Sequence, residues 1–218
     1  MKSMLVIGLG RFGHHLVENL AKYDNQIMII DKKEECLEDL IPIVTSAKIG
    51  DCTNVNVLKT LGIKNFDEVF VCIGTDFQSS LEITSLVKEM GAKHVVSKAT
   101  RDIQAKFLLK NGADEVVYPD KDISERLAKR ESNDKIFDYI ELSDGYGIFE
   151  ITPMAECIGK SIKEVNFRVK YNMHILGTKK ENAPKPNLMP GADHVFKKDE
   201  HLIVMAAEKD VDKLLKKK

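Results

Sequence analysis

The chain has 218 residues, of which 43% are hydrophobic and 31% charged, and its formal net charge is -1. This balance is typical of a folded protein of one or two domains and argues against a disordered chain. Basic and acidic residues are interleaved, so we expect no nucleic-acid partner. The apolar runs are shorter than the roughly 20 residues of a membrane helix, and the first one is expected to be a strand rather than a signal peptide. The four cysteines show no C-x-x-C spacing, which indicates reduced thiols in the cytoplasm.

Up to about residue 130, β-branched runs alternate with segments of helical periodicity. Strands are predicted at residues 4–8, 26–30, 44–49, 68–73, 94–97 and 115–118. Helices are predicted at residues 12–22, 33–40, 55–61, 77–90 and 103–111. This alternation predicts right-handed crossovers and a Rossmann-like, doubly wound parallel sheet, with helices on both faces.

The pattern changes after residue 131, where a polar segment at 132–135 is expected to be a linker or a frayed helix end. Strands are then predicted at 136–142, 148–151, 173–178 and 201–207, helices at 160–165 and 209–217, and a proline-rich loop at 181–191. The sequence therefore predicts two domains: residues 1–133 form an α/β domain, and residues 134–218 form a small α+β domain.

The first predicted strand leads into the motif V-I-G-L-G-R-F-G, which has the spacing G-x-G-x-x-G at Gly8, Gly10 and Gly13. Gly8 permits a tight turn, Gly10 lets backbone amides approach a diphosphate, and Gly13 lets the following helix pack closely. The phosphates would then meet the helix N-terminus. Asp31, at the end of the second strand, is placed to accept hydrogen bonds from ribose hydroxyls. The alternative is a structural glycine turn without a ligand.

Arg11 departs from what a dinucleotide loop requires. Its planar fork suits phosphate oxygens, which favours a ligand with more terminal phosphate charge than NAD, such as ATP or ADP. An arginine that projects into solvent is the alternative, although a cation at a helix N-terminus is mildly unfavourable without an anion. After the third strand, Asp51 could accept a hydrogen bond from an adenine amino group. Alternatively, Asp51 or Thr53 caps the next helix.

No catalytic constellation accompanies this nucleotide site. The sequence contains no G-x-S-x-G, Walker lysine or HExxH motif. Three histidines of the second domain, His174, His194 and His201, have no evident acid–base partner, and solvated or packing roles are expected for His14 and His15. We therefore expect a nucleotide sensor without catalytic residues rather than an enzyme. A small NAD(H)-dependent oxidoreductase or NADH-sensing regulator is the alternative; a redox-sensing repressor would need a DNA-binding helix-turn-helix, and none is apparent.

Several motifs together resemble the RCK proteins (regulators of potassium conductance), specifically the cytosolic gating subunits of Ktr- and Trk-type potassium uptake systems. They are the segments at 6–13, 50–53, 61–63, 112–114 and 118–122, together with Asp31. The C-terminal part resembles the RCK C-terminal domain. The resemblance implies a cytoplasmic protein, peripheral to the inner face of the membrane, that controls potassium flux through a potassium-translocating membrane subunit. It also implies homodimers that pair through a crossover helix near 121–131 and assemble into an octameric ring, with ATP favouring the conducting state and ADP the resting state.

The same resemblance implies the ligand-binding residues. For the nucleotide they are Gly8, Gly10, Arg11, Phe12, Gly13, Asp31, Lys32, Asp51, Cys52, Gly74, Thr75 and Lys98. Arg11 matches an arginine that reaches the γ-phosphate, and Asp120 matches a position associated with a divalent cation, with an N-cap of the next helix as its alternative. Arg168 and Asn172 match a region that contacts cyclic di-AMP; a surface loop before a strand is the alternative there.

Overall fold

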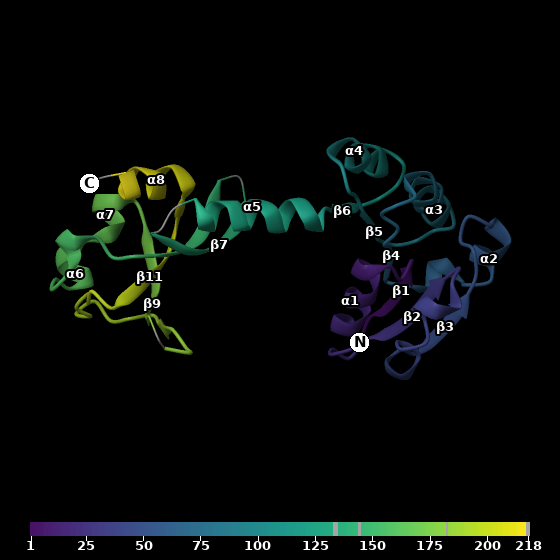
Figure 1. The fold of residues 1–218 in the computed structure, drawn as a ribbon, viewed down its shortest axis with the longest axis horizontal. Helices are drawn as coiled ribbons and strands as arrows, with labels where there is room; N and C mark the ends of the chain where they lie inside the picture. Colours follow the sequence, from purple (N-terminus) through teal and green to yellow (C-terminus); the bar gives the residue numbers. More distant parts are fainter. Residues whose placement is uncertain (133–134, 144, 182, 217–218) are drawn as a thin grey trace. The chain divides into compact units, whose positions relative to one another are not determined.

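The computed structural model describes residues 1–132, 135–143, 145–181 and 183–216. The chain divides into two compact units, Met1–Lys121 and Asp122–Lys218 (Figure 1). The domain boundary predicted between residues 133 and 134 lies outside the described residues. Within the described residues, no helix is long and apolar enough to cross a membrane.

Among the described residues of the first unit, six parallel strands form one sheet in the order β3-β2-β1-β4-β5-β6. The strands are β1 (Ser3–Ile7), β2 (Gln26–Asp31), β3 (Ser46–Ile49), β4 (Glu68–Val71), β5 (Val95–Lys98) and β6 (Glu115–Val117). The helices between them are α1 (Arg11–Leu20), α2 (Val55–Lys59), α3 (Phe77–Glu89) and α4 (Asp102–Lys110). The strand order reverses between β1 and β4, and ligands bind at the carboxyl ends of the strands beside such a reversal.

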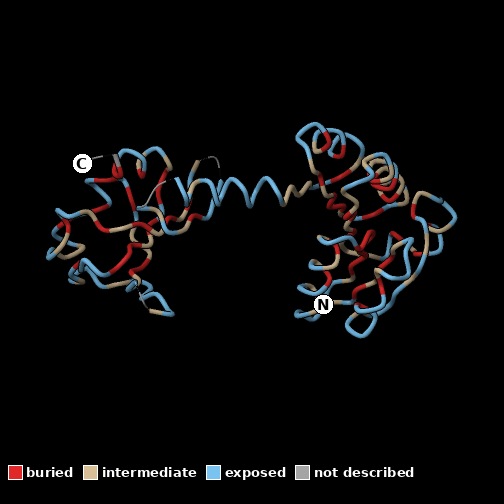
Figure 2. Tube along the Cα trace, viewed as in Figure 1, coloured by how far each residue is buried: buried red, intermediate tan, exposed pale blue. Residues whose placement is uncertain are grey.

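The side chains of β1 show why helices cover both faces of this sheet. Leu5 and Ile7 belong to the hydrophobic cluster that contains Ile83 of α3. Val6 belongs to the cluster that contains Val17 of α1. Since successive side chains of a strand point to opposite faces, one buried strand joins two apolar layers. β1 is buried along most of its length, and Figure 2 shows buried stretches within the first unit.

The helix predicted at 33–40 is wrong. That segment contains only a 3-10 turn at Glu34–Cys36, and a second one follows at Ile41–Ile43. Pro42 lacks the N–H donor that would continue an α-helix beyond Leu40, and it lies instead in the first turn of the second 3-10 segment. Leu37 and Leu40, whose spacing resembled a helix, are instead packed into the core under α1.

In the second unit, the described residues form an antiparallel sheet of five strands in the order β10-β9-β11-β8-β7. The strands are β7 (Ile136–Ser143), β8 (Tyr146–Ile151), β9 (His174–Lys180), β10 (Asn187–Leu188) and β11 (Glu200–Ala207). The helices are α5 (Pro119–Glu131), which begins in the first unit, and α6 (Ile162–Val165), α7 (Phe167–Tyr171) and α8 (Glu208–Lys216). The predicted Rossmann-like sheet and smaller α+β domain are thus confirmed.

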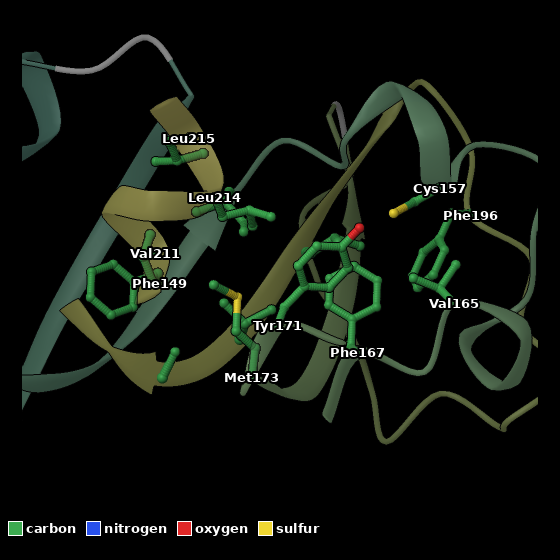
Figure 3. Close-up of a cluster of buried hydrophobic side chains, with 14 of the residues drawn as sticks. Phe149, Cys157, Val165, Phe167, Tyr171, Met173, Phe196, Val211, Leu214 and Leu215 are labelled. Carbon is green, nitrogen blue, oxygen red and sulfur yellow. The ribbon is translucent and has the colours of Figure 1, made fainter. Parts of the chain in front are cut away.

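Aromatic side chains fix the segment before β9, for which a surface loop was one of the two alternatives. Phe167 lies 5.3 Å from Phe196 and 5.1 Å from Tyr171, measured between ring centroids, and all three are buried. Figure 3 shows Tyr171 and Phe167 near Met173, and Phe196 near Cys157 and Val165. The alternative of a surface loop before β9 is therefore wrong, because burial of Phe167 and Tyr171, four residues apart, stabilises a short helix.

Candidate nucleotide-binding site

A cleft of about 680 Å³ opens at the carboxyl ends of the parallel strands. This volume suits a small ligand or cofactor. Twelve of the residues proposed for ligands line it: Gly8, Gly10, Arg11, Phe12, Asp31, Lys32, Asp51, Cys52, Gly74, Thr75, Lys98 and Asp120. Gly13 lies beneath the loop and is not among the described residues that line the cleft.

The three glycines of the loop have different roles. Gly8 has φ +89°, and a Cβ there would lie 2.8 Å from Cγ1 of Ile73. A Cβ on Gly13 would lie 2.1 Å from the carbonyl oxygen of Gly8. A Cβ on Gly10 would meet no atom within 4 Å. Gly8 and Gly13 are therefore required by the fold, whereas Gly10 leaves space free in front of the α1 N-terminus.

That N-terminus provides an anion site without a protein anion. Gly10 is the N-cap of α1 and supplies no side-chain cap, and the first turn contains no acidic residue. Arg11 is exposed at the first helical position and forms no ion pair with any described residue. The Nζ of Lys98 lies 5.4 Å from the ring centroid of Phe12. This helix end favours a phosphate-bearing ligand, because it offers free backbone N–H groups, the positive end of the helix dipole, and the cations of Arg11 and Lys98.

Asp31 connects the end of β2 to the glycine loop. Its Oδ2 accepts a hydrogen bond from the backbone N–H of Leu9 at 2.6 Å, and its Oδ1 accepts one from the N–H of Lys33 at 3.0 Å. Each carboxylate oxygen can accept a second hydrogen bond. The carboxylate can therefore hold the loop and still receive the hydroxyls of a ribose.

Asp51 occupies the turn after β3. Its Oδ1 accepts hydrogen bonds from the backbone N–H of Thr53 at 3.0 Å and from the Thr53 hydroxyl at 2.8 Å. The backbone hydrogen bond from Thr53 is the main cause that lowers the pKa of Asp51, so the carboxylate remains an acceptor at neutral pH. The N-cap of α2 is Asn54, which accepts a hydrogen bond from the N–H of Asn56. The alternative that Asp51 or Thr53 caps this helix is therefore wrong.

The structure adds polar residues to the cleft that were not predicted. Asp76 caps α3 by accepting a hydrogen bond from the N–H of Ser79. Gln104, which is buried, accepts hydrogen bonds from the N–H and hydroxyl of Thr100 at 3.0 and 2.7 Å. Asp76 directly follows the predicted Gly74-Thr75 pair and could have been found from it. Gln104 reaches the cleft through the packing of α4, for which no local motif exists.

Asp120 is the second residue of α5 and lines the cleft. Because the helix begins at Pro119, Asp120 lies within its first turn, and the alternative N-cap role is wrong. The described residues do not place Asp120 in a group of three or more protein ligands. A cation held there would take its other ligands from phosphate oxygens or water.

Three cysteines line the cleft, Cys36, Cys52 and Cys72, and burial raises the pKa of each thiol. Burial raises the pKa of both Cys52 and Cys72 to about 12, so neither is a thiolate at neutral pH. No histidine is among the described residues that line the cleft. The described cleft lining therefore presents neither a thiolate nor an imidazole as a nucleophile.

In the second unit, Asn172 lines a hollow beside α8, and Arg168 is not among its described lining residues. Asn172 has φ 56°, donates a hydrogen bond to Oδ2 of Asp210 at 2.8 Å, and lines a hollow of about 550 Å³ together with Lys213. Arg168 is exposed and does not line this hollow within the described residues. A role for either residue in binding cyclic di-AMP stays a prediction.

A parallel sheet of this order, with a glycine-rich loop at the reversal point, defines a Rossmann-like nucleotide-binding fold. Residues 4–119 match the TrkA-N domain, and residues 147–218 match the TrkA-C domain. The chain belongs to this TrkA family of RCK proteins, and the resemblance noted from the motifs is confirmed.

Two relatives from Bacillus subtilis (strain 168) align along almost the whole chain. The chain is 33% identical over 216 residues to Ktr system potassium uptake protein C, covering 99% of this chain and 97% of the relative. It is 34% identical over 210 residues to Ktr system potassium uptake protein A, covering 96% and 94%.

Solved structures share the fold at low sequence identity. The crystal structure of the GsuK RCK domain superposes with a TM-score of 0.66 at 16% identity, covering 98% of this chain and 47% of that chain. The GsuK channel bound to NAD gives a TM-score of 0.67 at 16% identity, covering 96% and 38%. This chain therefore spans less than half the length of those two chains.

Proposed function

We propose that this protein is the cytosolic regulatory subunit of a potassium uptake system. It binds an adenine nucleotide in the cleft of the first unit and controls potassium flux through a membrane partner by a nucleotide-dependent conformational change. The near full-length similarity to two Ktr system potassium uptake proteins supports the potassium system. The observation that carries the nucleotide proposal is the α1 N-terminus, which has no side-chain cap and no acidic residue in its first turn, and which begins at the exposed Arg11.

The proposed nucleotide would use three parts of the cleft. Its phosphates would occupy the open space at Gly10, with the terminal phosphate on Arg11. Its ribose hydroxyls would bind Asp31, and its adenine amino group would bind Asp51. An exposed guanidinium that lacks a described ion pair favours ATP and ADP over NAD(H), because it can form charge-assisted hydrogen bonds to a terminal phosphate. NAD(H) is the alternative ligand.

Subunit pairing is proposed through α5. None of its residues is buried, and its Ile123 and Leu127 are 65% and 47% exposed. Residues four apart lie on one face of a helix, so a second copy could cover both side chains. Following the family resemblance, we propose that such homodimers form an octameric ring beneath the membrane subunit. A divalent cation at Asp120 and cyclic di-AMP near Arg168 and Asn172 belong to the same proposal.

Calorimetric titration with ATP, ADP, NAD and NADH tests the ligand. We expect ATP and ADP to bind more tightly than NAD(H). Arg11→Ala should weaken ATP binding by about 10- to 100-fold, the value of a charge-assisted hydrogen bond, with a smaller effect on ADP. Arg101→Ala, at an exposed arginine outside the cleft lining, is the matched control and should change neither. A preference for NADH, or equal effects of Arg11→Ala on ATP and ADP, would overturn the role of Arg11.

The regulatory role is tested by potassium uptake in cells that lack their own uptake systems. The chain would be expressed with the membrane subunit encoded by the same organism. We expect potassium-dependent growth to require both proteins and to fall with Arg11→Ala. Uptake that is independent of this chain would contradict the proposal even if the nucleotide binds.

A further inference from the structure

A second cluster of ligating side chains lies on the surface of α1, outside the nucleotide cleft. The nitrogen and carboxylate atoms of His14, His15 and Glu18 all lie within 4.8 Å of one another. The Nδ1 of His15 is 2.9 Å from Oε2 of Glu18, and the Nδ1 of His14 is 3.6 Å from the same oxygen. Helical spacing explains the convergence, because Glu18 lies three and four residues after the two histidines.

A fourth side chain orients His14 from another part of the chain. The Nε2 of His14 lies 2.6 Å from Oδ2 of Asp39, in the segment between β2 and β3. When neutral His14 donates its Nε2–H to this carboxylate, the lone pair of its Nδ1 faces Glu18. A carboxylate that binds the outer nitrogen of a histidine is the usual support of a metal-ligating imidazole.

We propose that His14, His15 and Glu18 bind a divalent transition-metal ion of the zinc class, with Asp39 as the carboxylate that positions His14. Metal–ligand bonds of about 2.0–2.2 Å place tetrahedral ligand atoms about 3.3–3.6 Å apart. The distances of 2.9 and 3.6 Å to Glu18 bracket this range, and the nitrogens of the two imidazoles lie within 4.8 Å of each other, so side-chain rotation would have to complete the geometry. Two imidazoles and one carboxylate suit zinc, copper or nickel, whereas magnesium and calcium prefer oxygen ligands.

The exposure of the cluster defines the kind of site. The side chains of His14, Glu18 and His15 are 26%, 45% and 74% exposed. An ion bound there keeps at least one position open to water and exchanges with solvent. Through His14 and Asp39 it also strengthens the connection between α1 and the segment that follows β2. This inference is independent of the proposed function, because none of the four residues lines the nucleotide cleft in the described structure.

Zinc titration of the full chain, without an affinity tag and after removal of metals, tests the proposal. We expect one zinc ion per chain, competition with a chromophoric chelator at pH 7.5, and no comparable binding of magnesium. His15→Ala and Glu18→Gln should each weaken zinc binding at least tenfold, and Asp39→Asn should weaken it by about tenfold, as expected for an outer partner. Since His15 and Glu18 are exposed, these variants should fold, which circular dichroism verifies.

Two control variants separate this site from other zinc ligands. His94 also pairs with a carboxylate, because its Nδ1 lies 2.7 Å from Oε2 of Glu68. Within the described residues, however, it belongs to no cluster with a second imidazole. The His94→Ala variant should therefore bind zinc as tightly as the unchanged chain. Cys36→Ser should do the same. The proposal would be overturned if His15→Ala bound zinc with unchanged affinity, or if either control variant lost as much zinc affinity as His15→Ala. The short contacts between the histidines and Glu18 would then be ordinary ion pairs.

Discussion

Two glycines of the same loop should respond oppositely to the same substitution. At Gly13 a methyl group would lie 2.1 Å from the carbonyl oxygen of Gly8, a backbone atom that cannot move alone. At Gly10 the added methyl would meet no protein atom within 4 Å, and φ −62° and ψ 178° are accessible to alanine. We therefore expect Gly13→Ala to destabilise the first unit and Gly10→Ala to spare its stability but weaken nucleotide binding.

The magnitudes follow from opposing contributions. Overpacking at Gly13 costs about 3 kcal/mol, and the better helix propensity of alanine offsets about 1 kcal/mol, which leaves a net loss of about 2 kcal/mol. For a unit of this size, that lowers the melting temperature by about 6–12 °C. At Gly10 alanine is a poorer N-cap by about 0.5–1 kcal/mol, but it reduces the entropy of the unfolded chain by a similar amount. The net change there should stay within about 0.5 kcal/mol.

Urea unfolding of the full chain, followed by circular dichroism, measures both variants. Hydrogen exchange of the amides of β1 and β4 assigns the change to the first unit. ATP titration should show at least a tenfold loss for Gly10→Ala, because its methyl group occupies the space in front of the α1 N-terminus. An unfolding free energy for Gly13→Ala within 0.5 kcal/mol of the unchanged chain would refute the steric reasoning. A Gly10→Ala chain as unstable as Gly13→Ala would refute the division of roles.

Two further substitutions test electrostatic contacts. Asp31→Ala should destabilise the first unit by about 1–3 kcal/mol, because it leaves the N–H of buried Leu9 without its acceptor. It should also weaken the binding of every ribose-bearing ligand to the same extent. Unchanged urea unfolding curves and unchanged titrations would contradict both roles of Asp31. Burial raises the pKa of Asp138, but the hydrogen bonds from Arg126 and from the backbone N–H of Tyr139, together with the charges of Arg126 and Arg130, outweigh this effect, so the folded pKa is lowered. The half-exposed pair of Arg126 and Asp138 contributes less than about 1 kcal/mol to the free energy of unfolding. This contribution is present above the pKa of about 4 that Asp138 has in the unfolded chain, and it is lost as pH falls through the folded pKa. Asp138→Asn should flatten the acid limb of the stability curve below about pH 4, and an identical acid limb would contradict this assignment.

The strands of the first unit were predictable because buried parallel strands are continuous apolar runs. β1, β2 and β4 begin and end within one or two residues of the predicted segments. The predictions of secondary structure failed where tertiary packing decides the local structure. Leu37 and Leu40 have helical spacing but pack from turns, and α7 forms because Phe167 anchors it in an aromatic core.

The residues of the candidate sites also divide into those that a sequence motif predicts and those that tertiary packing brings together. Arg11 and Asp31 follow strands in a recognised motif, so their place at the cleft follows from the chain order alone. Gln104 and the pair of His14 with Asp39 depend on contacts between elements. The latter two residues are 25 positions apart, and no periodicity relates them. Solvated or packing roles for His14 and His15 were expected for this reason, whereas the structure places both imidazoles against carboxylates.

The contacts of Asp31 suggest how scaffold and selectivity are separated in this cleft. The loop is held by a carboxylate that accepts the Leu9 N–H, and by the close approach of Gly13 to Gly8. The proposed nucleotide would therefore meet a loop already fixed by protein contacts, and little of its binding free energy would be lost to ordering the backbone. Arg11, in contrast, is an exposed and rotamer-rich side chain at the edge of this loop. Only a ligand whose terminal phosphate reaches Arg11 can order it, so ligands that share the same ribose and adenine contacts would differ mainly through this one residue.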